Sequence, residues 1–203
     1  MLTVGIDEVG RGSLAGPLVA GAVILKPNFN PNRLRSWKCD DSKLLTKKQR
    51  ETAELQIRKV ALDTGLGWVS AAEIDRIGLT AAVRLAMERA LAEIRLPYHE
   101  IIIDGNYNFL SADPRAKAII QADALVPAVS AASIIAKVAR DNYMAEQAKE
   151  FLEYGFEKHV GYGTRLHLEK LKIHGPCAIH RRSFAPLNAK RQLPLLQVPA
   201  LSV

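Results

Sequence analysis

Short apolar runs separated by turn residues open the chain. Residues 2–6 and 18–25 read as two strands, and three glycines with Pro17 supply the turn between them. Because the connection is so short, we expect these two strands to form an antiparallel pair.

Helical patterns alternate with further strands along the middle of the chain. Thr46 and Gln49 form a capping-box pattern that predicts a helix running to about Leu62. Residues 66–70 read as a third strand. Apolar residues at helical spacing then predict a second helix from Thr80 to Ile94.

The second half repeats this alternation. Residues 100–104 and 116–120 read as strands, a long helix is predicted from about Ser130, and another helix at 165–173. This order of elements implies an α/β protein with a mixed sheet covered by helices. From Pro186 onward the periodicity is lost, so we expect residues 186–203 to be a flexible tail.

Composition adds a modest preference for a polyanionic partner. The 203 residues suit one domain, and 28 Lys and Arg against 21 Asp and Glu give a net charge of +7. Cys39 and Cys177 lie outside the spacings of disulfide scaffolds and zinc sites. No signal peptide or membrane-spanning run is evident, so we expect a cytoplasmic protein with no membrane contact.

Acidic residues mark the ends of several predicted strands. Asp7 and Glu8 interrupt the first apolar run, and Asp104 and Asp123 come at or just after two later ones. Burying an unpaired carboxylate is costly, and neighbouring strand ends in an α/β sheet can meet in one crevice. Four carboxylates gathered there would repel each other unless divalent cations neutralised them.

Carboxylate-only ligation suits Mg²⁺ or Mn²⁺ and disfavours zinc. Two such ions can catalyse in-line displacement at phosphorus, which would also explain the excess positive charge through a nucleic-acid substrate. The simpler interpretation is that each acid forms a turn or caps a helix. Asp141 is a rival fourth ligand, but pairing with Lys137 or Arg140 nearby is favoured for it.

A glycine-rich stretch follows the first acids. Gly10, Gly12 and Ala15 fit the loose dinucleotide-binding fingerprint, but a strand follows where that motif needs a helix. The Gly-Arg-Gly turn can instead bring the backbone close to a sugar hydroxyl, with Arg11 near a phosphate. A plain β-turn with a solvated arginine fits the sequence equally well.

Six ordered motifs together resemble one known family. "GIDEVGRGSLAGP", "DDSKLL", "IIIDGN", "SAASIIAKVARD", "GYGTRLH" and "HRRSF" are similar to the motif series of ribonuclease HII, across residues 4–184. The resemblance implies an RNase H-like fold, with a five-stranded mixed sheet flanked by helices. It also implies a catalytic domain at 1–185, of which about 145–185 form a small helical C-terminal segment.

The resemblance implies a function as well. Ribonucleases of this family cut the RNA strand of RNA/DNA hybrids and nick duplex DNA 5′ of single ribonucleotides, leaving 3′-hydroxyl and 5′-phosphate ends. We therefore expect a monomeric endonuclease of DNA replication and repair that uses two Mn²⁺ or Mg²⁺ ions. By this similarity Asp7, Glu8, Asp104 and Asp123 are the metal-binding and catalytic acids, although Ala122 stands where the family usually has glycine.

Further residues match substrate-binding positions. Gly10, Arg11 and Gly12 match the turn that senses the ribose 2′-hydroxyl, and Tyr162 matches the tyrosine that stacks on the following deoxyribose. Four basic residues are candidates for phosphate contacts, although each can equally be a solvated surface residue: Lys43, Arg140, Arg181 and Arg182.

The tail carries one more candidate motif. "QLPLL" at 192–196 resembles the peptide that bacterial sliding clamps capture, with Gln192, Leu193, Leu195 and Leu196 as the contact residues. Two alternative functions stay open: a metal-independent basic nucleic-acid-binding protein, and a nuclease of the same fold without ribose selectivity.

Overall fold

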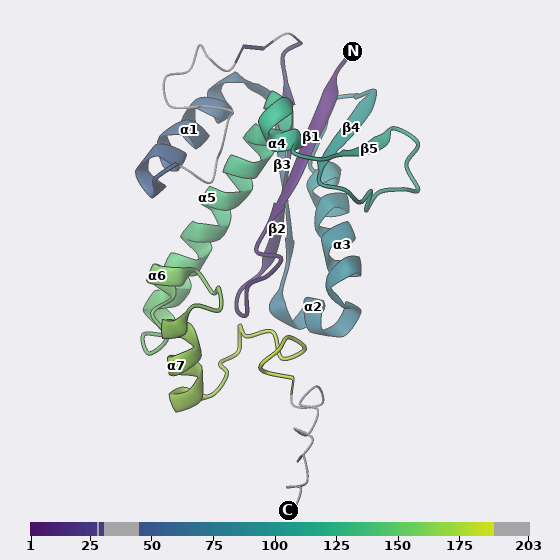
Figure 1. The fold of residues 1–203 in the computed structure, drawn as a ribbon. Coiled ribbons are helices and arrows are strands. Elements are labelled where there is room, and N and C mark those ends of the chain that lie inside the picture. The colour runs from purple at the N-terminus through teal and green to yellow at the C-terminus, as the bar shows by residue number, and fades with distance from the viewer. Residues whose placement is uncertain (28, 31–44, 189–203) are drawn as a thin grey trace, which may run out of the picture.

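A five-stranded mixed sheet forms the centre of the molecule (Figure 1). The structure is a computed structural model that describes residues 1–27, 29–30 and 45–188. The strands lie in the order β3-β2-β1-β4-β5. Their bounds are β1 Thr3–Val9, β2 Leu18–Leu25, β3 Ala61–Val69, β4 Glu100–Asp104 and β5 Ala116–Ile119.

The pairing of the strands explains the mixed character of the sheet. β1 and β2 are antiparallel, as the short connection predicts, and β3 continues this antiparallel half. β4 lies parallel to β1 on its other side, and β5 lies parallel to β4. The predicted α/β fold with a five-stranded mixed sheet is therefore confirmed.

Helices cover both faces of the sheet (Figure 1). α3 (Leu79–Ala92) packs on β2 and β3, while α5 (Pro127–Glu150) packs on β1 and β2 from the other side, next to α1 (Lys47–Val60). Side chains alternate along β1, so Val4 and Ile6 join the core on the α3 side. Gly5, which lies between them, therefore faces α5.

Small residues let α5 approach the sheet very closely. A Cβ on Gly5 would lie 2.2 Å from the carbonyl carbon of Ala128, and one on Gly21 would lie 2.4 Å from the Ala132 oxygen. The small residues at the start of the predicted long helix thus serve the packing of that helix against β1 and β2.

Several element boundaries differ from the predicted ones. The capping box at Thr46 is present, but α1 ends at Val60 because β3 begins at once, at Ala61. α5 begins at Pro127, a residue suited to the first turn of a helix. Three short helices were not predicted: α2 (Ala71–Ile77), α4 (Ala122–Leu125) and α6 (Phe156–His159).

The C-terminal segment packs against the loop that connects β1 to β2. After α5 come α6 and α7 (Arg165–His174), which lie at the end of the sheet where that loop is found (Figure 1). Ala15 of the loop shares an apolar cluster with Tyr154 and Phe156. None of the helices in the described ranges is both long enough and apolar enough to cross a membrane.

Candidate active site

A pocket of about 560 Å³ lies beyond the C-terminal half of β1. It is lined by carboxylates of β1 and β4, by the β1–β2 loop, by α5, and by Arg50 and Tyr162. The lining residues are Asp7, Glu8, Val9, Gly10, Arg11, Gly12, Arg50, Asp104, Ser133, Lys137 and Tyr162.

Strand register brings the acids of β1 and β4 together. Ile6 pairs with Ile103 in the parallel ladder, so the next residues of the two strands, Asp7 and Asp104, are neighbours. Because Asp7 follows Ile6, it faces α5, where its carboxylate interacts with the Ser133 hydroxyl. Glu8 donates its backbone N–H to Asp7 Oδ1 at 2.8 Å.

Burial and neighbouring charges perturb two of the three carboxylates, Asp7 and Glu8. Burial, followed by the charges of Glu8 and Asp104, raises the pKa of Asp7 to about 8, against a hydrogen bond from Ser133 that lowers it. Burial also raises the pKa of Glu8, which Arg11 opposes through an ion pair of 3.7 Å. In this pocket, the charged form of the Asp7 and Glu8 carboxyl groups is thus energetically unfavourable.

Asp123 lies beside this pocket and does not line it. It belongs to the first turn of α4, directly after β5, and its backbone N–H donates to Asp104 Oδ1 at 3.4 Å. Sequence analysis placed the side chains of all four acids in one crevice. The structure brings three of them together and keeps the fourth next to Asp104.

Side-chain chemistry favours a hard divalent cation at this place. Within the described ranges, no group of three or more His, Cys, Asp or Glu side chains has the arrangement of a metal site. Charge favours a cation here, because burial and the neighbouring carboxylates raise the pKa of Asp7 and of Glu8, which a bound cation would reverse. Oxygen-only donors suit Mg²⁺ or Mn²⁺.

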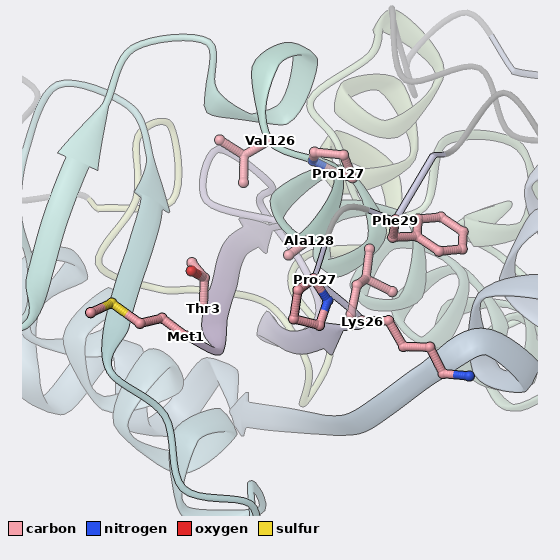
Figure 2. A pocket seen from close by; sticks show the side chains of 9 residues that line it. Met1, Thr3, Lys26, Pro27, Phe29, Val126, Pro127 and Ala128 are labelled. Atoms are coloured by element: carbon pink, nitrogen blue, oxygen red, sulfur yellow. The ribbon is translucent and has the colours of Figure 1, made fainter.

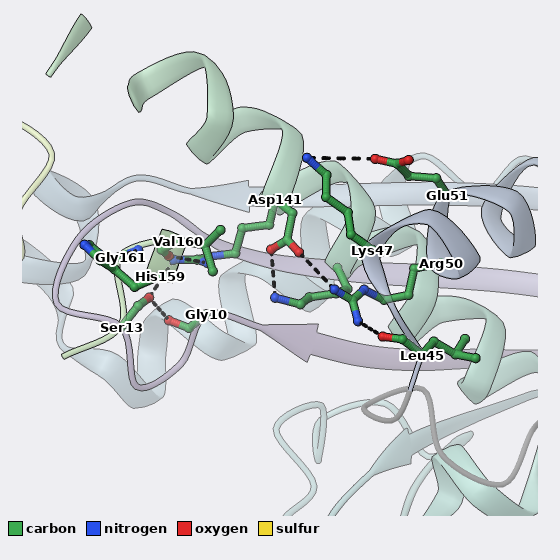
Figure 3. Close-up of polar contacts among 12 residues, drawn as sticks. Gly10, Ser13, Leu45, Lys47, Arg50, Glu51, Asp141, His159, Val160 and Gly161 are labelled. Carbon is green, nitrogen blue, oxygen red and sulfur yellow. Dashed lines mark hydrogen bonds and ion pairs between the residues drawn. The ribbon is translucent and has the colours of Figure 1, made fainter. Parts of the chain in front are cut away.

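Asp141 forms ion pairs with two basic side chains that line the pocket, Lys137 and Arg50 (Figure 3). Its carboxylate lies 2.7 Å from Lys137 Nζ and 3.7 Å from Arg50 Nη2. The predicted pairing with Lys137 is thus observed, while Arg140 points elsewhere. Sequence analysis missed Arg50, because it comes from α1 and no local pattern links it to α5.

The Gly-Arg-Gly turn has one tightly packed and one open glycine. Gly10 has a φ of +85°, and a Cβ there would lie 2.2 Å from Arg140 Nε. No atom lies within 4 Å of a Cβ built on Gly12. Arg11 and Gly12 are both exposed, so the turn presents its backbone to whatever enters the pocket.

The predicted phosphate contacts of Arg140 and Arg181 are wrong, because both side chains are buried. Both are fully buried, and their guanidinium groups donate to backbone carbonyls of the β1–β2 loop. Arg140 bonds Pro17 and Ala15, and Arg181 bonds Gly16 and Arg11. They stabilise the conformation of the loop from the interior of the protein and cannot reach a phosphate at the surface.

The other predicted basic residues differ in their surroundings. Arg182 is exposed, and its backbone N–H donates to Asp75 Oδ2 at 2.8 Å. Lys43 lies outside the described residues. So do the tail residues Gln192, Leu193, Leu195 and Leu196.

Tyr162 stands at the edge of the pocket, half-buried, above two cations. Lys137 Nζ lies 5.9 Å from the centroid of its ring, and the Arg140 guanidinium carbon 5.4 Å. The ring thus has a supported face, as a stacking platform requires.

A second hollow lies at the opposite end of β1 (Figure 2). Met1, Thr3 and Pro27 line it together with Val126 and Ala128. Of the described residues around it, Lys26 is the only one with a charged side chain. It offers no carboxylates for catalysis, so the acidic pocket is the candidate active site.

Comparisons with known proteins point to one family. The sequence profile of the family "Ribonuclease HII" matches residues 4–187. A curated relative, ribonuclease HII of Delftia acidovorans, is 46% identical over 186 residues, which cover 92% of this chain and 77% of the relative.

Solved structures agree with the sequence matches. The ribonuclease H2 of Pyrococcus horikoshii superposes with a TM-score of 0.78 at 30% identity, covering 92% of this chain and 95% of that one. The ribonuclease HII of Archaeoglobus fulgidus, solved in a complex with PCNA, gives 0.74 at 26% identity, covering 91% and 95%. With its five-stranded sheet, its acidic pocket and these matches over nearly its whole length, this chain belongs to the ribonuclease HII family and is a hydrolase of the ribonuclease H type.

Proposed function

We propose that this enzyme nicks duplex DNA on the 5′ side of single embedded ribonucleotides and cuts the RNA strand of RNA/DNA hybrids. The observation that carries the proposal is the shared pocket of Asp7, Glu8 and Asp104, with the exposed Arg11 and Gly12 of the Gly-Arg-Gly turn and a tyrosine at its edge. Carboxylates supply the chemistry of phosphodiester hydrolysis, and the turn and the tyrosine supply a means of reading the sugar.

Ribose selection follows from two features of the pocket, the Gly-Arg-Gly turn and the Tyr162 ring. The exposed backbone at Arg11 and Gly12 offers polar groups to a 2′-hydroxyl, and no side chain of Gly12 obstructs its approach. On the other side, the Tyr162 ring stacks on the next sugar, where a 2′-hydroxyl would crowd it. A ribonucleotide followed by a deoxyribonucleotide fits both the turn, which bonds the 2′-hydroxyl, and the Tyr162 ring, which needs a sugar without one.

Asp7, Glu8 and Asp104, joined by Asp123 beside them, would hold the divalent cations. Two such ions, when bound, supply activation of the attacking water and stabilisation of the leaving oxygen. The chain itself positions the acids through the β1–β4 register and the Ser133 hydroxyl. Lys137 and Arg50, held by Asp141, place positive charge where the substrate phosphates enter.

The test uses end-labelled duplex DNA containing one ribonucleotide, incubated with Mg²⁺ or Mn²⁺. We expect nicking 5′ of the ribonucleotide, with 3′-hydroxyl and 5′-phosphate ends. We expect none with EDTA, with an all-DNA duplex, or with Asp7→Asn. Binding without cleavage would favour the basic nucleic-acid-binding alternative, and equal cutting of the all-DNA duplex would favour a nuclease without ribose selectivity.

We also propose that the tail tethers the enzyme to a sliding clamp during DNA replication and repair in the cytoplasm. The observation in favour is the "QLPLL" sequence at 192–196, together with the archaeal ribonuclease HII that was solved with PCNA. Residues 1–185 would then form a monomeric catalytic domain and the tail its tether.

A pull-down with purified clamp tests the tether. Binding should be lost when Gln192 and Leu193 are both replaced by alanine, while nicking of free duplex should be unchanged. No binding by the unaltered chain would remove this proposal without affecting the catalytic one.

A further inference from the structure

Three buried histidines gather beside the loop that carries Tyr162. His159, His167 and His180 are 6%, 0% and 2% exposed. The rings of His159 and His167 stack at 4.4 Å between centroids, and those of His167 and His180 lie 5.2 Å apart. Nothing in the catalytic account uses them, although burying imidazoles requires partners for their nitrogens.

The hydrogen bonds of His167 and His180 form a directional chain. The Cys177 backbone N–H lies 2.9 Å from His180 Nδ1, so this nitrogen must accept. His180 Nε2 therefore carries the proton and donates to His167 Nε2 at 3.0 Å. His167 Nδ1 then donates to the Tyr162 carbonyl at 3.0 Å. Each ring is neutral, and its tautomer is fixed by its neighbours.

This series of hydrogen bonds ends at the Tyr162 loop, which is also hydrogen-bonded to the β1–β2 loop. Thr164 N–H donates to the same Tyr162 carbonyl, at 2.8 Å, and the Gly161 carbonyl accepts from Leu14 and Ala15 of the β1–β2 loop. His180 itself forms a backbone bridge with Ala15. The histidine chain, the Tyr162 loop and the β1–β2 loop therefore form one connected unit.

We propose that His167 and His180 are positioning residues that set the Tyr162 ring for recognition of the sugar. Of these two histidines, His167 bonds the Tyr162 carbonyl through its ring, and His180 acts by fixing the tautomer of His167. The inference rests on the proposed role of Tyr162 at the ribose-to-deoxyribose junction. It adds a hydrogen-bond relay, from the Cys177 N–H through His180 and His167 to the Tyr162 carbonyl, whose histidines do not line the acidic pocket.

Substitutions at His167 separate positioning from folding. His167→Leu removes the donor to the Tyr162 carbonyl, whereas His167→Asn keeps an N–H near the position of Nδ1. His174→Asn, an exposed histidine on the same helix, is the matched control. The readout is the ratio of nicking rates for a ribonucleotide followed by a deoxyribonucleotide and one followed by another ribonucleotide.

We expect His167→Leu to lower this ratio about tenfold, and His167→Asn and His174→Asn to keep it near the wild-type value. In a Tyr162→Ala background, His167→Leu should cause no further loss, because coupled residues do not add. A folded His167→Leu protein with the wild-type ratio, or full additivity with Tyr162→Ala, would overturn the proposal.

¹⁵N NMR of labelled histidines tests the relay independently of activity. We expect a proton on Nδ1 of His167 and on Nε2 of His180 at neutral pH. The opposite tautomers, or a charged ring, would overturn the relay even if nicking is normal. The expected tautomers in a protein that does not nick at ribonucleotides would instead contradict the proposed function.

Discussion

Two glycines of one turn have different physical duties. Gly10 needs its glycine for folding, because it has a positive φ and faces Arg140. Gly12 has neither constraint, so its lack of a side chain serves the open surface of the turn. The sequence shows both as the same kind of residue, and only the packing separates them.

Alanine substitutions at these glycines should therefore give opposite results. Gly10→Ala should lower the free energy of unfolding by about 1–3 kcal/mol, measured by denaturant unfolding. Gly12→Ala should leave stability within about 0.5 kcal/mol and slow nicking at a ribonucleotide, since its methyl group obstructs the sugar. Equal loss of stability in both variants would contradict this assignment.

His180 should make the fold sensitive to acid. Burial, then the electrostatic influence of the neighbouring His167, lowers the pKa of His180 to about 4, and His159, Tyr154, Cys177 and Arg182 also face this ring. The unfolded chain binds the proton below about pH 6.5 and the folded chain only below about 4. The contribution of His180 to stability should therefore be complete above pH 6.5 and be lost as the pH drops toward 4.

Unfolding midpoints measured between pH 4 and 7 check this expectation. The loss attributable to His180 should be on the order of 2–3 kcal/mol, and a His180→Asn protein, without the titrating ring, should show a smaller slope over this range. Asp7, with its raised pKa, contributes a slope of opposite sign over this range, so the comparison of the two proteins is the test. Equal slopes for wild type and His180→Asn would contradict the expectation.

At the scale of elements, the buried arginines connect segments that are distant in the sequence. Arg140 on α5 donates to Pro17, Val160 and Ala15 carbonyls and to the Ser13 hydroxyl, so one side chain fixes two loops. Burial lowers the pKa of Arg140 and lowers that of Arg181 to about 9. Carbonyl acceptors in place of carboxylates make this an uncommon way to hold buried cations.

Arg140→Met should destabilise the protein by about 3 kcal/mol or more, because several buried acceptors lose their donor. Arg182→Met is the matched control on an exposed arginine and should change stability by less than about 0.5 kcal/mol. Thermal unfolding of the two variants compares them directly. Similar midpoints would mean that Arg140 does not stabilise the loops.

Sequence patterns predicted the long elements better than the short ones. β2 is a continuous apolar run of eight residues, and α3 and α5 follow helical apolar spacing over still longer stretches, whereas α4 and α6 have four residues each and leave no periodic signal. α2 did have a signal, the capping box of Ser70 and Glu73, which was overlooked. The burial of Arg140 and Arg181 was not predictable, because the carbonyls that receive them come from irregular loops.

At the scale of the whole molecule, the parallel pairing of β1 with β4 is what brings the acids of the two strands together. The strand-end acids were visible in the sequence, and the chain order alone did not say which strands are neighbours. The position of Asp123 could not be predicted from strand ends, because the four-residue helix α4 places it beside Asp104 and outside the pocket lining.

The most direct test of the account is the metal-dependent nicking rate of the Asp104→Asn variant on duplex DNA with one ribonucleotide. Glu88→Gln, an exposed acid on α3, is the control. We predict that wild type and Glu88→Gln nick only with Mn²⁺ or Mg²⁺. Asp104→Asn should be slower by more than about a hundredfold, the upper end for losing a group that only supports a metal ligand. Nicking by Asp104→Asn at the wild-type rate, or nicking in EDTA, would contradict the claim that this pocket holds the catalytic cations.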